Sequence, residues 1–401
     1  MKFKYALGLI GAGGVGIAHR QAMDLLQKQG RAYLKAVADP TLKKHSPLEG
    51  ELLARKINVY PDYETMLNAE PDLSAVTIAT PTPFHAEMTR RCLKQGLKVY
   101  LEKPPVPLIQ QLDELIAIDV LGDVYVGFQM INSAWATQLK QWIGEGRFGE
   151  IKTIRAGACW PRTDTYYNRA FWAGKMAHQG NPIFDGPATN ALAHLIQSIM
   201  FLADSSESGY AEPVAVQGEL YRARRIESYD TACARGWFRS GLAFEIAVTH
   251  ATQNEWPFHI HIRGSNGWAT VSNDGQLLES SWGRNQYDET TIELMKRSYE
   301  LFLDYLEGRR TRVITSLCDT RGYVLTTNGM LLSSDGICDI GNQWIRGYRN
   351  AKNDGGYDVT SLHEAVQETV RSGKLFSEQH RPWAQSSSVI NLNEITQLSI
   401  N

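Results

Sequence analysis

The sequence predicts an α/β protein of two domains. Residues 1–125 should form a doubly wound parallel sheet, and residues 126–401 an α+β domain with one large mixed or antiparallel sheet. Three observations predict this class. The chain has 401 residues, more than one typical domain. Its first part alternates short apolar runs with longer helical stretches, and from about residue 151 β-rich runs follow one another directly.

The first domain should contain buried strands with helices between them. Strands that alternate with helices imply right-handed crossovers and hence a parallel sheet. The expected strands are 4–10, 32–39, 74–80, 97–103 and 124–130. The expected helices are 17–29, 47–57, 62–69 and 84–95.

The second domain should be built on one large sheet. Its expected strands are 151–160, 212–221, 231–238, 242–251 and 258–264. Its expected helices are 135–144, 190–203, 292–307 and 360–371. The polar stretch 380–400 is either a loose tail or an arm packed on a neighbouring subunit, and the sequence does not choose between them.

Composition excludes several classes of function. The chain is 43% hydrophobic and 21% charged, with a net charge of −2, which offers no general attraction to nucleic acid or anionic lipid. Its five cysteines form no CxxC and no metal-ligand spacing, which favours a reducing compartment. The apolar run at the N-terminus is too short for a membrane span. We therefore expect a cytoplasmic protein with no metal, nucleic-acid or membrane partner.

A glycine-rich turn follows the first expected strand. In "LGLIGAGGVGIAHRQAM", Gly11, Gly13 and Gly16 have the G-x-G-x-x-G spacing, with Gly14 and Val15 between the last two. Between a strand and a helix, Gly11 can make the tight turn and Gly13 can bring backbone N–H groups to a pyrophosphate. Gly16 then allows close packing of helix and strand. The start of the helix adds partial positive charge, so the turn predicts a dinucleotide site.

Asp39 indicates which dinucleotide is bound. It ends the second expected strand, 23 residues after Gly16, where a carboxylate can accept both ribose hydroxyls of the adenosine half. A carboxylate would repel the 2′-phosphate of NADP, so NAD is favoured. Lys43 and Lys44 follow closely and could offset the repulsion, which keeps NADP open.

The segment "TPTPFHAE" (80–87) follows the expected strand 74–80. Ligands of open α/β sheets bind outside the carboxyl ends of the strands, so Thr80 and Pro81 are expected to wall the nicotinamide side of the cofactor site. His85 is a further candidate contact there. In such a position a histidine more often has a structural role at a helix start than a catalytic one.

The segment "YLEKPP" (100–105) ends the next strand at the same edge. Glu102 and Lys103 stand at the strand tip, before Pro104. A lysine held there could reach the space above a nicotinamide, so both residues are candidate cofactor contacts and Lys103 is also a candidate substrate contact.

These motifs together resemble the Gfo/Idh/MocA family of nicotinamide-dependent oxidoreductases. The glycine turn, the Glu-Lys-Pro at 102–104 and a later helix with His194 carry the resemblance, which extends over nearly the whole chain. It implies an N-terminal Rossmann domain and a C-terminal domain whose open-faced sheet often mediates oligomers, here a homodimer or homotetramer. It also implies hydride transfer on sugars, inositols or related polyols, with Lys103 and His194 in the site.

One position departs from the family pattern. Where relatives commonly have Asp four residues before the histidine, this chain has Asn190, and Asp185 lies five residues earlier as an imperfect substitute. Asn190 can orient the substrate or the histidine but cannot supply negative charge. His194 is the expected general base, because an imidazole titrates near neutral pH. Lys103 remains an alternative proton acceptor.

An aromatic segment is the main candidate for substrate contact. Aromatic faces can stack on the CH groups of a sugar ring, while tyrosyl and guanidinium groups bind its hydroxyls. Packing between domains would explain the same cluster equally well for any single residue. The candidates within "CWPRTDTYYNRAFWAGK" are Trp160, Arg162, Tyr166, Tyr167, Arg169 and Trp172.

Several alternatives remain open. A redox-neutral hydrolase or epimerase with tightly held NAD would use the same fold, and so would a non-catalytic dinucleotide sensor, which the missing Asp at 190 favours. Aldehyde or biliverdin-reductase-like chemistry is also compatible, since fold does not fix function.

Two further residue groups have a favoured structural interpretation. His259 and His261 have the spacing of a metal pair, but no third ligand is evident, so a strand-face role is favoured. The basic group "RARR" (222–225) is expected on a solvated face.

Overall fold

The computed structural model describes residues 4–42 and 46–398, which form two compact units. Unit 1 contains the residues up to 106 together with 111–132 and 289–320. Unit 2 contains residues 107–110, 133–288 and those from 321 onward. These borders differ from a single division at residue 125. Residues 289–320 belong to unit 1, although they come after most strands of the large sheet in the sequence.

Unit 1 is built on a six-stranded, fully parallel sheet in the order β3-β2-β1-β4-β5-β6. The order reverses direction at β1, as in a doubly wound fold, so the predicted class is confirmed. The short strand β3 was not predicted. The strands are β1 (Tyr5–Ile10), β2 (Ala32–Ala38), β3 (Asn58–Tyr60), β4 (Ala75–Ile78), β5 (Lys98–Glu102) and β6 (Val124–Gly127). The connecting helices are α1 (Gly16–Lys28), α2 (Ser46–Ala54), α3 (Tyr63–Ala69), α4 (His85–Lys94) and α5 (Ile109–Ile118).

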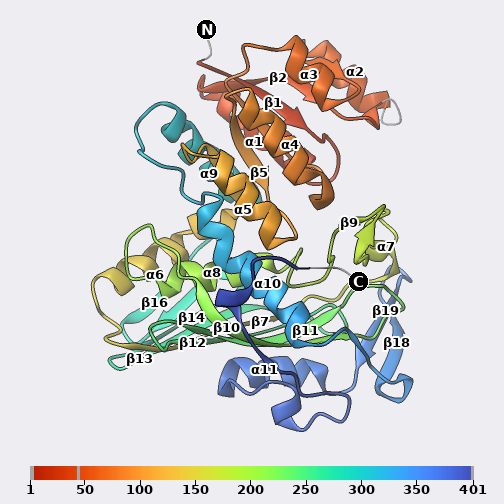
Figure 1. The fold of residues 1–401 in the computed structure, drawn as a ribbon, viewed down its shortest axis with the longest axis vertical. Helices are drawn as coiled ribbons and strands as arrows, with labels where there is room; N and C mark the ends of the chain where they lie inside the picture. Colours follow the sequence, from red (N-terminus) through yellow and green to blue (C-terminus); the bar gives the residue numbers. More distant parts are fainter. Residues whose placement is uncertain (1–3, 43–45, 399–401) are drawn as a thin grey trace. The chain divides into compact units, whose positions relative to one another are not determined.

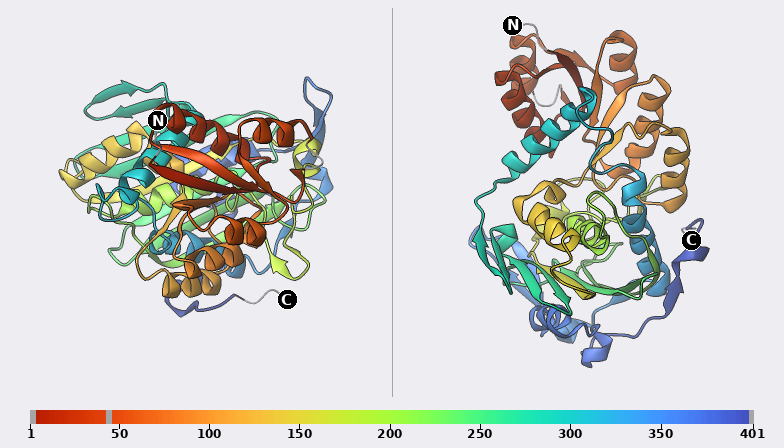
Figure 2. Two further views of the ribbon diagram at one scale, coloured as in Figure 1. Left: turned by 90° about the horizontal axis from the view of Figure 1, so that it is seen from above. Right: turned by 90° about the vertical axis from the view of Figure 1, so that its left-hand side faces the viewer.

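Helix α9 (Thr291–Leu306) completes the core of unit 1 although it comes late in the chain. It lies beside α1 in Figures 1 and 2. Its buried face, with Met295, Tyr299 and Phe302, joins the same apolar cluster as the strands β1, β2 and β4. The Tyr299 ring stacks on Tyr100 of β5 at 4.6 Å between centroids. The parallel sheet therefore depends on a segment that is distant in sequence.

Unit 2 is built on a ten-stranded mixed sheet. Its main path runs β16-β15-β14-β13-β7-β12-β11-β10-β17, and β20 pairs with β10. The pairs β7–β12 and β10–β17 are parallel and the others are antiparallel, as a mixed sheet requires. The five predicted strands correspond to β7 (Ile151–Cys159), β10 (Pro213–Arg222), β11 (Thr231–Phe238), β12 (Ala243–Thr249) and β13 (Trp256–Gly264). The remaining strands are β14 (Trp268–Ser272), β15 (Leu277–Ser280), β16 (Gly283–Gln286), β17 (Cys338–Asp339) and β20 (Val389–Asn391), with the separate pairs β8 (Ala177–His178) and β9 (Asn181–Pro182), and β18 (Ile345–Arg349) and β19 (Gly355–Val359).

Helices cover both faces of this sheet. In Figure 1, α8 and α10 lie on one face and α11 on the other. A second apolar cluster lies beneath α11, where Val366, Phe376 and Trp383 pack with Cys233 and Ala247 of the sheet. The helices of unit 2 are α6 (Ala134–Gly144), α7 (Asp164–Tyr167), α8 (Ala193–Ala203), α10 (Arg321–Ser333) and α11 (Leu362–Ser372).

The C-terminal stretch packs on its own chain over its described length. Strand β20 pairs with β10, and the backbone N–H of Leu398 donates to Gln110 Oε1 at 3.1 Å. Residues 380–398 are therefore not a loose tail, and the alternative of an arm packed on a neighbouring subunit stays a prediction. Among the described helices, none has the length and apolar character to cross a membrane.

Candidate active site

The glycine turn has the geometry that its spacing predicts. Gly11 has φ +90°, and a Cβ there would lie 2.6 Å from the Ala79 carbonyl oxygen. A Cβ on Gly16 would lie 2.2 Å from the Gly11 carbonyl oxygen. Nothing lies within 4 Å of a Cβ built on Gly13 or Gly14. The turn is thus packed against backbone atoms at its two ends and open in its middle.

The open part of the turn suits a pyrophosphate. No hydrogen bond within the described chain uses the N–H groups of Gly14 and Val15, and helix α1 begins at the next residue. Val15 is 43% exposed, so this surface is accessible. Backbone donors at a helix start form a ready anion site, and the residues present therefore fit a dinucleotide.

Asp39 follows β2 and hydrogen-bonds to the backbone of the glycine turn at Ala12. Its Oδ2 accepts from the Ala12 N–H at 2.9 Å, and its Oδ1 accepts from the N–H and the hydroxyl of Thr41 at 2.8 and 2.7 Å. Burial raises the pKa of this carboxyl, but the hydrogen bonds from Thr41 and Ala12 outweigh burial and lower it overall. Asp39 is therefore a charged anchor beside the turn. Lys43 and Lys44 lie outside the described residues.

Lys103 stands directly after β5, at the carboxyl edge of the parallel sheet. The Lys103–Pro104 peptide is cis, and the Lys103 N–H donates to Glu102 Oε2 at 3.1 Å. Lys103 is half-buried. Its backbone is thus fixed by the carboxylate of the preceding residue.

Glu102 is the centre of a buried polar network that the sequence did not reveal. Its Oε1 lies 2.9 Å from His19 Nε2 and accepts from Gln129 Nε2 at 2.9 Å. His19 Nδ1 in turn lies 2.7 Å from the hydroxyl of Tyr299. His19 comes three residues after Gly16, on the first turn of α1. The network therefore connects the start of the dinucleotide helix to the strand tip that carries Lys103.

His85 connects two loops of this edge. Its Nδ1 lies 2.9 Å from the Pro104 carbonyl oxygen and its Nε2 lies 2.8 Å from the Thr80 carbonyl oxygen. Burial lowers its pKa. Both nitrogens thus face backbone oxygens, which positions Thr80 and Pro81 and the Glu-Lys-Pro segment. Asp39, Thr80 and Lys103 all follow carboxyl ends of parallel strands.

In unit 2 the helix with His194 begins later than predicted. Helix α8 starts at Ala193, so His194 lies in its first turn and Asn190 lies in the turn before it. The expected helix 190–203 therefore begins three residues late, and the expectation that Asn190 is helical is wrong. The hydroxyl of Thr189 hydrogen-bonds to the Phe184 carbonyl and to the Gly186 N–H, which holds this segment as a turn.

Asp185 supplies a carboxylate next to Asn190. Asn190 Nδ2 donates to Asp185 Oδ1 at 2.7 Å, and the Gly174 N–H donates to Asp185 Oδ2 at 2.7 Å. Arg169 Nη2 lies 3.9 Å from the same Oδ2. Asn190 is thus paired with a buried carboxylate five residues earlier in the chain.

The aromatic segment forms alternating layers of rings and guanidinium groups. Arg162 lies over Trp160 and Tyr166, with its Cζ 5.5 and 5.0 Å from the ring centroids. Arg169 lies over Tyr166 and Trp172 at 3.5 and 4.5 Å. The structure thus brings five of the predicted candidates into one cluster of unit 2, namely Trp160, Arg162, Tyr166, Arg169 and Trp172.

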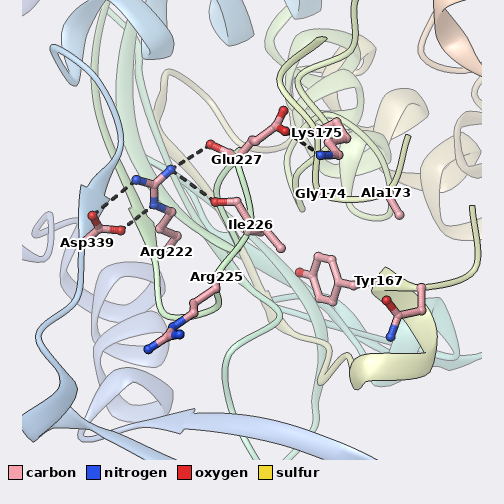
Figure 3. Close-up of a pocket in the computed structure, with 10 residues that line it drawn as sticks. Tyr167, Ala173, Gly174, Lys175, Arg222, Arg225, Ile226, Glu227 and Asp339 are labelled. Atoms are coloured by element: carbon pink, nitrogen blue, oxygen red, sulfur yellow. Dashed lines mark hydrogen bonds and ion pairs between the residues drawn. The ribbon is translucent and has the colours of Figure 1, made fainter. Parts of the chain in front are cut away.

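Tyr167 belongs to the same segment and lines a separate hollow. Figure 3 shows its ring beside Ile226 and Arg225, across from the Lys175–Glu227 ion pair. The Arg224 Cζ lies over the Tyr167 ring, 4.7 Å from its centroid.

Arg224 is buried and pairs with Asp164, so the expectation that the group "RARR" lies on a solvated face is wrong for this residue.

The two strand histidines have structural partners. His259 stacks on Trp256 at 4.1 Å between centroids, and His261 Nδ1 lies 2.8 Å from the Thr270 hydroxyl. Over the part of the chain that the structure describes, no group of three or more His, Cys, Asp or Glu side chains could hold a metal ion.

Comparison with known families matches both units. Residues 5–122 match the oxidoreductase family with an NAD-binding Rossmann fold, and residues 136–270 match the GFO/IDH/MocA C-terminal domain. Inositol 2-dehydrogenase of Rhizobium meliloti (strain 1021) is 28% identical over 149 residues, which cover 37% of this chain and 43% of that protein. The match therefore spans less than half the length of that relative.

Solved structures share the fold over most of the chain. The WlbA dehydrogenase from Bordetella pertussis, in complex with NADH and UDP-GlcNAcA, has a TM-score of 0.70 at 22% identity and covers 83% of this chain and 97% of its own. Levoglucosan dehydrogenase in complex with NADH has a TM-score of 0.70 at 18% identity and covers 82% and 97%. At these identities the likeness establishes the fold.

Proposed function

Because the chain belongs to the Gfo/Idh/MocA oxidoreductase family, we propose that it is an NAD-dependent dehydrogenase that oxidises a CH–OH group of a sugar, inositol or related polyol. The observation that carries this function is the turn from Gly11 to Gly16, open at Gly13 and Gly14 and anchored by Asp39. The names of the relatives, inositol 2-dehydrogenase and levoglucosan dehydrogenase, support the substrate class.

The cofactor would be held by unit 1. The N–H groups of Gly14 and Val15 and the start of α1 would bind the pyrophosphate, and Asp39 the adenosine ribose. Thr80 and Pro81 would stand beside the nicotinamide, with His85 holding their loop to Pro104. The charge of Asp39 favours NAD over NADP.

Proton transfer would be the task of His194 and Lys103. When bound, NAD supplies the acceptor for the hydride that leaves the carbinol carbon. His194 takes the hydroxyl proton, and Lys103 stabilises the negative charge that develops on the same oxygen. Asn190 orients the substrate or His194 through its amide oxygen, and Asp185 adds negative charge behind that amide. Lys103 is the alternative proton acceptor.

The substrate ring would lie against the aromatic cluster of unit 2. Trp160 and Tyr166 offer faces for its CH groups, and Arg162, Tyr167 and Arg169 offer donors for its oxygens.

A substrate screen combined with one variant tests the proposal. Sugars and polyols are incubated with NAD and with NADP in parallel, and NADH or NADPH formation is followed by absorbance. Lys103→Met should lower turnover at least about a hundredfold, the scale of a lost proton-transfer group, while NAD affinity changes far less. Equal turnover in the variant would contradict the assigned role of Lys103. Retained NAD without net NADH release would instead favour the redox-neutral alternative.

We further propose a cytoplasmic location and a homodimeric or homotetrameric state. The free cysteines are consistent with a reducing compartment. Helix α11 and its neighbours occupy one face of the large sheet, so subunit contacts on that side would use β13 to β16 or the outer surface of α11.

A further inference from the structure

Buried polar atoms without partners gather around Tyr166. Across the described residues, Trp160 Nε1, Arg162 Nε, Tyr167 Oη and His250 Nε2 have almost no exposed surface and no hydrogen-bond partner. Most buried polar groups in proteins are satisfied, so several unsatisfied groups in one place indicate a site that binds a polar ligand. The unsatisfied atoms include both donors and an acceptor.

His250 provides the acceptor. Only 3% of the residue is exposed, and its Nδ1 lies 2.8 Å from the Trp160 carbonyl oxygen, which can only accept. Nδ1 therefore carries the hydrogen, and Nε2 presents a lone pair. Burial, and then the charge of Arg162, lower the pKa of His250 to about 3, so the ring is neutral at pH 7. A neutral acceptor of this kind matches a hydroxyl group.

Arg162 provides the cationic donor. Its backbone N–H donates to the His250 carbonyl oxygen at 3.1 Å, so the two residues are held side by side. The other two arginines of the cluster each have a carboxylate, Arg169 near Asp185 and Arg224 with Asp164. The guanidinium of Arg162 has no carboxylate within 4 Å in the described chain; it hydrogen-bonds to the Pro161 carbonyl, 3.3 Å from Nη1, and to the side chain of Tyr166. Because a partly buried cation is stabilised by a nearby negative charge, the Arg162 guanidinium favours the binding of an anion.

We propose that Arg162 and His250 form a subsite for a carboxylate-bearing sugar, in which Arg162 binds the carboxylate and His250 Nε2 accepts from a neighbouring hydroxyl. This inference rests on the proposed function, because it names the substrate class of the same site in unit 2. A single guanidinium matches the single charge and planar fork of a carboxylate better than a phosphate dianion. Beside Arg162, Trp160 would offer its ring face to the sugar ring and its Nε1–H to a sugar oxygen.

Matched pairs of sugars test the substrate class. The pairs d-glucuronate and d-glucose, d-galacturonate and d-galactose, and d-mannuronate and d-mannose differ only at C6. With NAD and wild-type protein, kcat/KM should be at least about tenfold higher for the acid of the preferred pair, the scale of one charge-assisted hydrogen bond. d-Glucose 6-phosphate is the control for anion type. Equal or lower values for the acids in every pair, or a preference for the phosphate, would overturn the proposal.

Variants locate the effect at the two residues. Arg162→Gln should remove the preference for the acid mainly through KM, while Arg162→Lys should retain part of it. His250→Phe should weaken both members of a pair alike. Arg239→Gln changes an exposed arginine of the same unit and should have no effect. An acid preference that survives Arg162→Gln would also overturn the assignment.

Calorimetry separates this inference from the proposed function. If only neutral sugars or polyols reduce NAD, the dehydrogenase stands and the subsite is wrong. If no sugar reduces NAD, the proposed function fails, and titration of d-glucuronate and d-galacturonate into NADH-saturated protein decides the subsite. Binding of either acid that Arg162→Gln abolishes would support it, and absence of binding by both would refute it.

Discussion

At the scale of single residues, position 190 shows how a missing charge can be replaced from nearby. Asn190 stands where a carboxylate is expected, and its amide donates to Asp185 at 2.7 Å. Asp185 is 5% exposed and is held by the Gly174 N–H. Asp185 therefore supplies a negative charge beside Asn190, and we propose that this charge takes the place of a carboxylate at position 190.

Asp39 should determine the choice of cofactor. Asp39→Asn keeps the size of the side chain and an oxygen for the bond from Ala12, but removes the charge that repels a 2′-phosphate. We expect the ratio of kcat/KM for NAD over NADP to fall about tenfold or more. Steady-state kinetics with both cofactors measure this ratio. An unchanged ratio would show that Asp39 does not face the ribose.

His250 should make the stability of the protein fall at acid pH. Its pKa is about 3 in the folded protein, against 6.5 for an unperturbed histidine. Between these values the unfolded chain binds a proton that the folded chain does not, so the contribution of His250 is complete above pH 6.5 and is lost as the pH falls towards 3. From pH 7 to pH 5 the wild type should lose about 2 kcal/mol more of its unfolding free energy than His250→Gln.

Urea unfolding at pH 7, 6 and 5 measures this difference. Because other groups titrate equally in both proteins, subtracting the two curves isolates His250. Parallel curves would mean that His250 is charged, or exposed, in the folded protein.

At the scale of elements, the glycine turn combines a constraint of folding with one of binding. Gly16 has no room for a Cβ, whereas Gly13 has open space around it. Gly16→Ala should therefore lower the free energy of unfolding by about 3 kcal/mol through overpacking against Gly11. Gly13→Ala should leave stability within about 0.5 kcal/mol of the wild type but weaken NAD binding. Chemical unfolding and calorimetric titration with NAD separate the two effects.

Gly16→Ala and Gly13→Ala serve as controls for each other. If both variants lost stability equally, the middle of the turn would be packed rather than open. If Gly13→Ala bound NAD as tightly as the wild type, the pyrophosphate would not lie on Gly13.

The elements that sequence patterns predicted are those with long buried runs. Strands such as β1 and β12 are nearly continuous apolar segments, and their residues are almost all buried. Strand β3 has three residues and β16 is fully exposed, so neither carries a readable pattern. Helix α10 contains two glycines and two threonines, which have low helix propensity, and it forms because it packs on β10.

The candidate site was predictable where it depends on local sequence. The glycine turn and the strand tip at Lys103 could be identified from spacing and from the ends of strands. The bond of Glu102 to His19 could not, because it joins side chains from segments far apart in the sequence. Asp185 could be noted from its position near Asn190, but the bond between them depends on the turn that connects them. That Arg162 has no carboxylate beside it among the described residues is likewise a property of the folded cluster.

At the scale of the whole molecule, the chain crosses between its two units more than once. Unit 1 begins at the N-terminus but is completed by residues 289–320, which follow most of the large sheet. Tyr299 and Phe302 of α9 are fully buried in the core of unit 1. Unit 1 is therefore formed by segments that lie on both sides of residues 133–288 in the sequence.

Unit 1 should depend on that returning segment for its stability. A protein that ends at residue 132 would expose the apolar surface that α9 covers, and we expect it to aggregate or unfold. The same chain with residues 289–320 joined through a flexible linker should fold and bind NAD. Circular dichroism during heating and calorimetric titration with NAD compare the two. A stable, NAD-binding protein without 289–320 would show that α9 is dispensable.

The central claim is that Lys103 of unit 1 and His194 of unit 2 act on one substrate beside the nicotinamide. A crystal structure of the protein with bound NADH measures this directly, from the positions of Lys103 Nζ and the His194 ring relative to nicotinamide C4. We predict that both groups face one space next to C4, each within hydrogen-bond reach, about 3 Å, of a single substrate oxygen placed there. Side chains that point away from C4, or that lie too far apart to touch one small molecule, would contradict the account.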